Sequence, residues 1–322
     1  MSTKERLLAR LEKCQGDYVS GEMLAAEMGV SRNSIWKAVK ALRGEGYRID
    51  AATNRGYALS FDSDRLSPSG IQHHLKHKDA FSISVRRSVS STNTWARERA
   101  LAGDAEGTLV IAEGQSAGRG RRGKRFFSPE GSGIYLSVVL RPSITAKESH
   151  LLTCAAAVAC ARAIELVSGK TAEIKWVNDV YCSGRKVSGI LTEGSCCLEE
   201  GRFEYAILGV GINVKVPQEG FPDEISACAG ALFDTDGPSV RCKLAAAFLD
   251  EFWDLYTRLP DDSFKDEYRR RCFLMGKPIT ALVGGRKVCG KAVDVDSDFR
   301  LVLEQPNGAL FALRFENTSI QS

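Results

Sequence analysis

Apolar residues recur at helical spacing in three short segments near the start of the chain. The first two segments are residues 4–13 and 20–28, and the third follows Ser31 and includes residues 32–42. In the third, Ile35, Ala38, Val39 and Leu42 fall on one side of the helix, and Ser31 is placed to cap its N-terminus. The opposite side is left to polar, basic and aromatic residues. The pattern predicts a helix-turn-helix with one buried and one exposed face on its last helix.

Two short strands around a turn containing Arg55 follow this helix. A helix in the major groove, with a basic hairpin or wing on the flanking backbone, would account for residues 1–62. The residues expected to contact DNA are the exposed ones, Arg32, Asn33, Trp36, Lys37, Lys40 and Arg55. A helical protein-interaction module would share this pattern, so DNA binding is a hypothesis here.

Beyond residue 62 the pattern mixes strands with longer helices and predicts an α+β domain up to residue 275. The expected strands are residues 81–85, 107–112, 134–140, 173–181, 185–193 and 206–214. The expected helices are residues 69–78, 95–102, 147–167, 240–259 and 261–274. From residue 276 to 322, short strands separated by turns predict a small β-barrel.

Composition indicates a globular protein. The 322 residues are 43% hydrophobic and 26% charged, which suffices for two or three domains with a sizeable core. A net charge of +4 is only mildly basic, so any electropositive site must be local. Ten cysteines without a C-x-x-C pair, and a charged start from Lys4 in place of a secretory signal, predict reduced thiols and a cytoplasmic location. The longest apolar run, residues 151–161, is too short to span a bilayer.

The highest local charge lies in a glycine-rich segment that we call the basic loop, residues 113–128. Its basic residues and glycines are Arg119, Arg121, Arg122, Lys124 and Arg125, with Gly118, Gly120 and Gly123. Glycines weaken helices and strands and like charges repel, so the loop predicts a site for a phosphate or carboxylate. Neither the dinucleotide fingerprint nor the P-loop fits, because no helix follows. A solvated basic turn or a nucleic-acid patch is the alternative.

Polar residues also interrupt the predicted strands on both sides of residue 183. Burying Lys175, Asn178, Asp179 and Lys186 is costly unless they are paired or functional, so the four together favour a binding site. A structural ion pair is an equal alternative for Lys175. Glycines in the strand 206–214 predict a close approach between the backbone and a ligand.

Two further groups of polar side chains have open interpretations. Ser91, Thr92 and Asn93 either cap the helix that follows them or offer hydrogen-bond partners to a polar ligand. His73 and His77 lie four residues apart, a spacing that can hold a metal. Because no third ligand stands nearby, we expect solvated side chains and no metal site there.

Several motifs resemble, in the same order, those of the biotin protein ligases. They are Gly118-Arg-Gly-Arg-Arg-Gly123 with Phe127-Ser-Pro129, Lys175-Trp-Val-Asn-Asp179, Lys186-Val-Ser-Gly-Ile-Leu-Thr-Glu193 and Gly209-Val-Gly-Ile-Asn213. With the helix-turn-helix, they make the chain similar to the bifunctional bacterial type, biotin–acetyl-CoA-carboxylase ligase and biotin operon repressor. Family members often have Pro where Val177 stands and a Trp near Phe126, and we expect these departures to affect packing only.

The resemblance implies a fold and a reaction. The fold is a winged helix-turn-helix in residues 1–62, a mixed-sheet class II synthetase-like ligase domain in residues 63–275 and an SH3-like β-barrel in residues 276–322. In the reaction, the carboxylate of biotin attacks the α-phosphate of ATP to give biotinyl-5′-adenylate and pyrophosphate. The amine of a lysine on a biotin carboxyl carrier protein then attacks this mixed anhydride. Mg²⁺ would be held largely by phosphates and water, and no protein ligand is assigned to it.

The resemblance also assigns roles by motif position. The catalytic residues it implies are Arg119, Asp179 and Lys186, with Lys186 as the first choice for stabilising charge in the transition state. The biotin-binding residues it implies are Ser91, Thr92, Asn93, Gln115, Arg119, Gly120, Arg121 and Lys186. The ATP-binding residues it implies are Arg121, Lys124, Asn178, Asp179 and Asn213. An adenine-covering loop should lie in residues 216–238, where no residue can be matched individually.

Operator DNA and a second copy of the chain are the further partners implied. Ordering of the basic loop by the adenylate would stabilise a homodimer whose two recognition helices meet a palindrome. Three other functions remain open. They are a lipoate protein ligase with the same fold and adenylate chemistry, a repressor that senses biotin without turning it over, and a ligase whose N-terminal module no longer regulates.

Overall fold

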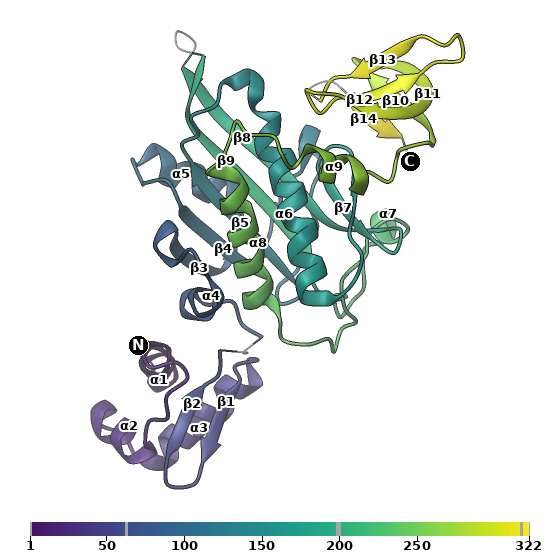
Figure 1. Ribbon diagram of the computed structural model, residues 1–322. Coiled ribbons are helices and arrows are strands. Elements are labelled where there is room, and N and C mark those ends of the chain that lie inside the picture. Colours follow the sequence, from purple (N-terminus) through teal and green to yellow (C-terminus); the bar gives the residue numbers. More distant parts are fainter. Residues whose placement is uncertain (1, 62–63, 198–200, 316–317, 322) are drawn as a thin grey trace.

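The computed structural model describes residues 2–61, 64–197, 201–315 and 318–321, and Figure 1 shows their arrangement. The predicted domain boundary between residues 62 and 63 lies outside the described residues. The N-terminal domain and the C-terminal sheet lie at opposite ends of a large central domain (Figure 1).

The N-terminal domain is the predicted helix-turn-helix followed by a hairpin. Its elements are α1 (Thr3–Lys13), α2 (Gly21–Met28), α3 (Arg32–Gly44), β1 (Ile49–Ala52) and β2 (Gly56–Leu59). Ser31 Oγ accepts a hydrogen bond of 3.2 Å from Ser34 N, which confirms the predicted cap. Ile35, Val39 and Leu42 are buried in a core separate from that of the rest of the chain.

A seven-stranded mixed sheet forms the centre of the next domain, in the order β3-β4-β5-β9-β8-β7-β6. Its strands are β3 (Ser82–Val89), β4 (Thr108–Gln115), β5 (Gly133–Leu140), β6 (Glu173–Lys175), β7 (Asp179–Cys182), β8 (Arg185–Cys197) and β9 (Arg202–Asn213). Only the β3–β4 pair is parallel among these described strands. The two long strands β8 and β9 form the hairpin that carries two of the predicted motifs.

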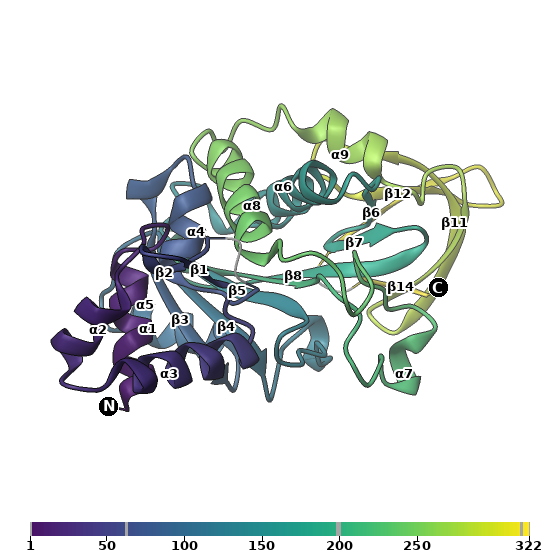
Figure 2. The same ribbon diagram turned by 90° about the horizontal axis from the view of Figure 1, so that it is seen from below.

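Helices cover both faces of this sheet. The helices α6 (His150–Ser168) and α8 (Arg241–Tyr256) pack on one face, and α5 (Thr92–Leu101) packs on the other against β4, β5 and β9 (Figure 2). The shorter helices are α4 (Pro68–His74), α7 (Asp223–Ser226) and α9 (Lys265–Arg271). The site therefore stands on a rigid three-layer scaffold.

The helix α6 illustrates how composition sets position. Twelve of its side chains are buried against the sheet and α8, and most of these belong to the small residues Ala and Cys. The helix is therefore core scaffolding, as predicted. By length and composition alone, the segment Ala146–Ser168, with a mean hydropathy of 1.7, could cross a membrane, but 67% of its apolar window is buried inside the protein.

Three sequence predictions need correction. The strand expected at residues 173–181 is a hairpin, with Lys175 paired to Asp179 across a turn. The reason is burial, because Trp176 Nε1 donates to Phe299 O at 2.8 Å and Val177 O accepts from Tyr268 Oη at 3.1 Å, which turns both residues into the core. The helix expected at residues 69–78 ends at residue 74, and the one expected at 261–274 is the shorter α9.

The C-terminal segment is a five-stranded antiparallel sheet in the order β13-β12-β11-β10-β14. Its strands are β10 (Pro278–Val283), β11 (Arg286–Val295), β12 (Leu301–Glu304), β13 (Leu310–Leu313) and β14 (Thr318–Gln321). Its buried residues, such as Ala281 and Leu303, join the same hydrophobic core as the central domain. The position of this sheet relative to the central domain is therefore set by packing.

Candidate functional site

The predicted substrate-binding residues surround one cavity of about 360 Å³. The cavity lies over β8 and β9 and is closed by the N-terminus of α5, the basic loop, the β6–β7 hairpin, the segment around α7 and the strand β14. Every residue predicted to serve biotin, ATP or catalysis lines it. These residues are Ser91, Thr92, Asn93, Gln115, Arg119, Gly120, Arg121, Lys124, Asn178, Asp179, Lys186 and Asn213.

One end of the cavity is a buried hydrogen-bond network at the start of α5. Thr92 N and Oγ1 donate to Gln115 Oε1 at 2.8 and 3.1 Å, and Gln115 Nε2 donates to Ser128 Oγ at 2.9 Å. Asn93 Nδ2 donates to Glu193 Oε2 at 2.8 Å. Ser91 makes no side-chain capping bond, so these residues are arranged around the cavity rather than as a helix cap.

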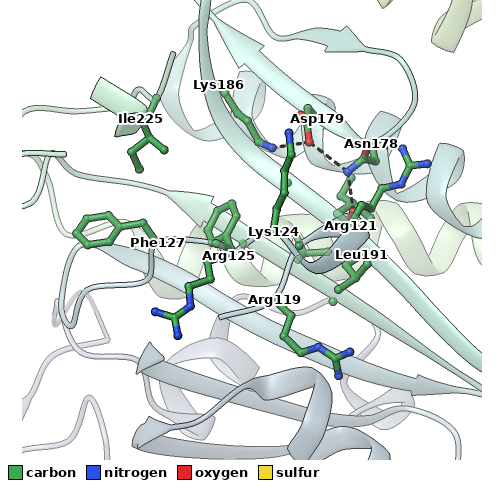
Figure 3. A pocket seen from close by; sticks show the side chains of 18 of the residues that line it. Arg119, Arg121, Lys124, Arg125, Phe127, Asn178, Asp179, Lys186, Leu191 and Ile225 are labelled. Carbon is green, nitrogen blue, oxygen red and sulfur yellow. Dashed lines mark hydrogen bonds and ion pairs between the residues drawn. The ribbon is translucent and has the colours of Figure 1, made fainter. Parts of the chain in front are cut away.

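The basic loop folds as a tight hairpin at the cavity mouth. Gly120 N donates to Lys124 O at 2.8 Å, and Arg119 and Arg125 form a backbone bridge. Arg119 Nη2 pairs with Glu193 Oε1 at 3.0 Å, with its side chain 43% exposed. The side chain of Lys124 points toward Asp179 and Lys186, whereas those of Arg119 and Arg125 point away from this pair (Figure 3).

A chain of polar contacts joins the loop to the strands (Figure 3). Arg121 Nη1 donates to Asn178 Oδ1 at 3.0 Å, and Asn178 Nδ2 donates to Asp179 Oδ1 at 3.1 Å. Lys186 Nζ lies 2.6 Å from the same carboxylate oxygen. Three of the four polar residues predicted in these strands thus hold one another in place, and Lys186 presents an oriented ammonium group to the cavity.

The glycines of the site make room for protein side chains. A Cβ atom on Gly209 would lie 1.9 Å from Asn93 Oδ1, and one on Gly211 would lie 2.4 Å from Phe126 Cε1. In the basic loop, a Cβ atom on Gly118 would lie 2.4 Å from Phe126 O. Other atoms do approach the backbone of these glycines closely, as expected, but they belong to protein side chains and backbone rather than to a ligand.

Sequence reasoning missed part of the cavity wall. Phe221 and Ile225, from the segment around α7, line the cavity, and Phe221 contacts Phe127 edge to face at 6.4 Å between ring centroids. Thr318, on β14, also lines it, and so does Lys175, one of the four polar strand residues that were predicted to form a site. No motif could have identified the first three, because their neighbours in the cavity are distant in sequence.

The predicted DNA-contacting residues lie on α3 and on the turn between β1 and β2 of the N-terminal domain. All six are exposed, namely Arg32, Asn33, Trp36, Lys37, Lys40 and Arg55. Lys40 Nζ lies 5.5 Å from the centroid of Trp36, and the guanidinium of Arg55 lies 4.1 Å from that of Tyr18. Both cations keep their charge available to an anionic partner.

The two histidines considered for a metal have other contacts. His73 stacks on Phe61 with ring centroids 3.6 Å apart, and His77 Nε2 lies 2.9 Å from Asp254 Oδ1. Among the residues that the structure describes, no three His, Cys, Asp or Glu side chains gather closely enough to hold a metal ion.

Comparisons with known proteins agree with this site. Residues 85–213 match the biotin/lipoate A/B protein ligase family, and residues 3–58 match a helix-turn-helix domain. The chain is similar to the bifunctional ligase/repressor BirA of Bacillus subtilis, at 34% identity over 310 residues, 95% of each chain. The protein of the same name from Escherichia coli is 27% identical over 304 residues, 93% of this chain and 92% of the other.

A solved structure shows the same fold. A biotin protein ligase from Aquifex aeolicus, in complex with biotin and ATP, superposes with a TM-score of 0.63 and 24% identity. The match covers 74% of this chain and 98% of the other. The seven-stranded sheet and its helices therefore have the architecture of a ligase catalytic domain.

Proposed function

Because the chain belongs to the family of bifunctional biotin protein ligases and repressors, we propose that it activates biotin with ATP, transfers it to a carrier-protein lysine and represses transcription. One observation carries the enzymatic half. A single cavity joins a hydrogen-bonding end, an oriented lysine and a basic loop. A cytoplasmic location follows from this proposal, since its substrates and DNA meet there.

Biotin is proposed to bind at the α5 end of the cavity. Thr92, Asn93 and Gln115 are already held by hydrogen bonds, so they would meet the polar ureido ring with little loss of entropy. Ser91 and Gly120 complete this end. The apolar body of biotin would lie over the β8–β9 strands, which directs its carboxylate toward Lys186.

Lys186 is proposed to serve the reacting centre. Two anions must meet there, at a Coulomb cost of about 1 to 4 kcal/mol at 4 Å for effective dielectric constants of 80 to 20. The ammonium of Lys186, fixed by Asp179 at 2.6 Å, would offset this repulsion and stabilise the charge that develops on the α-phosphate. Arg119 and Arg121 would add positive charge once the loop closes on the adenylate.

The nucleotide is proposed to lie beside Asn178, Asn213 and Lys124. Phe127, Phe221 and Ile225 form an apolar edge suited to an adenine ring, and this supports the proposal that the segment around α7 covers the adenine. Among the described residues that line the cavity, only Asp179 carries a carboxylate, and this carboxylate is paired with Lys186. Mg²⁺ would therefore arrive with the phosphates of ATP rather than occupy a protein cage.

The test of this function is mass spectrometry of the purified protein with biotin and Mg-ATP. We expect biotinyl-adenylate and pyrophosphate, and then a biotinylated lysine when a biotin carboxyl carrier protein is added. No adenylate from folded protein would favour lipoate as substrate, and no turnover of either acid would favour a domain that only senses its ligand.

The finer architecture is also a proposal. We assign residues 1–62 to a winged DNA-binding domain, 63–275 to a class II synthetase-like ligase domain and 276–322 to an SH3-like barrel. The separate N-terminal core supports the first boundary. The five antiparallel strands, with a bulge between Ala292 and Asp294, are consistent with a small barrel.

DNA binding by the exposed face of α3 predicts a strong dependence on salt. Replacing Lys37 or Lys40 with alanine is expected to flatten the plot of log affinity against log salt by about 0.9 for each phosphate contact removed. A fluorescence-anisotropy titration with operator DNA measures this slope. Lys13→Ala, an exposed substitution on α1, is the matched control and should retain the parent slope. If the DNA affinity of the parent protein did not change with salt concentration, the proposed repressor function would be refuted.

Dimerisation is the proposed link between ligand and DNA. Ordering of the basic loop by biotinyl-adenylate would stabilise an interface between two copies, so that two α3 helices meet a palindromic site together. Sedimentation velocity should show an increase in mass when the adenylate is added. An unchanged sedimentation coefficient at concentrations that saturate the cavity would refute this coupling.

A further inference from the structure

The hydroxyl of Thr318 is the first observation that the proposed function leaves unexplained. Thr318 begins β14, is 2% exposed and lines the catalytic cavity from the C-terminal sheet. Its Oγ1 is buried and has no hydrogen-bond partner among the residues that the structure describes. A buried hydroxyl without a partner is destabilising, so its position at the cavity wall points to a ligand atom that would complete it.

The environment of Lys175, on β6, is the second observation that the proposed function leaves unexplained. It lines the same cavity and is half-buried, and no carboxylate oxygen of a described residue lies within 4.0 Å of its Nζ. The neighbouring Asp179 holds Lys186 instead. Burial lowers the pKa of Lys175, and the charges of Lys186 and Lys124 add to this effect while Asp179 opposes it. A phosphate would neutralise this crowded positive charge.

The order of the strands gives these two residues a place in the reaction. Along the sheet, the proposed biotin end lies at β4, Lys186 on β8, Asp179 on β7 and Lys175 on the edge strand β6. Adjacent strands are about 4.8 Å apart. Lys175 therefore lies beyond Lys186 on the side away from biotin. Figures 1 and 2 both place β14 at this end of the sheet, far from β3.

Displacement at phosphorus requires the attacking and leaving oxygens to be roughly in line. A carboxylate oxygen of biotin forms a bond to the α-phosphorus while the bond from that phosphorus to the bridging oxygen of the β-phosphate breaks. The bridging oxygen keeps the electron pair and leaves as part of pyrophosphate. With biotin on the β4 side of Lys186, the leaving group departs on the β6 side.

We propose that Lys175 and Thr318 form the subsite for the β- and γ-phosphates of ATP, and so for the pyrophosphate that leaves. The Thr318 hydroxyl donates a hydrogen bond to a phosphate oxygen, and the Lys175 ammonium supplies a charge. The C-terminal sheet thereby contributes a residue to nucleotide binding. This inference rests on the proposed adenylation and goes beyond it by placing the leaving group.

The reverse reaction tests the subsite directly, because pyrophosphate is then a substrate. ATP formation from biotinyl-adenylate and Mg-pyrophosphate is measured for the parent and for Thr318→Val, Thr318→Ser and Lys175→Gln. We expect Thr318→Val and Lys175→Gln to raise the KM for pyrophosphate roughly 10-fold or more, the loss typical of a hydrogen bond to a charged group. Thr318→Ser keeps the hydroxyl and should stay near the parent. Biotin affinity, measured by calorimetry, should be unchanged in all three.

Matched controls separate the subsite from general damage. Thr280→Val on the neighbouring strand β10 and Lys277→Gln lie outside the cavity and should behave as the parent. If the KM of Thr318→Val for pyrophosphate equals that of the parent, the proposed subsite is wrong, and the proposed ligase activity is unaffected. A serine variant as impaired as the valine variant shows that the hydroxyl alone does not restore binding of pyrophosphate, and this outcome overturns the hydrogen bond. A folded parent that makes no ATP refutes the adenylation itself, and the subsite with it.

Discussion

Replacing Lys186 with alanine is expected to slow biotinyl-adenylate formation by about 10²- to 10³-fold, the effect of removing one preorganised group that stabilises transition-state charge. The ammonium is oriented before substrates bind, since Asp179 Oδ1 lies 2.6 Å from it and Asn178 in turn donates to that carboxylate. Single-turnover mass spectrometry at saturating biotin and Mg-ATP isolates this step from product release.

The control for this variant is Lys243→Ala, an exposed position on α8 outside the cavity lining, which should keep the parent rate. Asp179→Asn keeps the hydrogen-bonding shape but removes the charge that fixes the lysine, so we expect an intermediate rate. If Lys186→Ala folded like the parent and formed adenylate at the parent rate, the proposed role of Lys186 would be wrong.

The chemistry of the site was largely predictable because charge leaves a local signature. Five basic residues among glycines cannot stabilise a helix or strand, and polar residues in apolar strands must be paired or functional. The structure brings these residues to one cavity. The Asp179–Lys186 pair shows the same logic, since neither residue would be stable alone in that strand environment.

The features of the site that could not be predicted from the sequence depend on contacts between segments that are distant in the chain. The hairpin at Lys175 and Asp179 forms because Trp176 and Val177 are buried against residues about 90 to 120 positions later, a preference that strand periodicity does not contain. Position 209 must be glycine because the side chain of Asn93, which is distant in sequence, occupies the space that a Cβ atom would need. Thr318 has no local feature that marks it as part of the site.

Replacing Arg241 with methionine should cause the largest loss of stability. Arg241 is 2% exposed, and its Nη1 lies 2.6 Å from Glu113 Oε2, while its Nε lies 3.3 Å from Asp64 Oδ1. Removing one partner of a buried ion pair leaves a buried charge and costs about 3 to 5 kcal/mol. For a domain of this size the melting temperature should fall by roughly 10 °C, measured by circular dichroism.

The double variant Arg241→Met with Glu113→Gln decides whether the loss comes from charge or from packing. The glutamine side chain would still accept the hydrogen bond that Leu66 N donates to Glu113 Oε1 at 2.9 Å, but it carries no charge to be left unpaired. We therefore expect the double variant to be more stable than Arg241→Met alone, because paired buried charges often contribute little net stability. Arg258→Met, an exposed arginine just after α8, is the matched control and should melt like the parent. Equal losses of stability in the single and double variants would mean that Arg241 acts by filling space.

The position of the two carboxylates gives a charge effect a further consequence. Glu113 begins the basic loop, and Asp64 lies in the segment that leads from the DNA-binding domain. A charge effect would therefore link the integrity of the site to that of the connection between the domains.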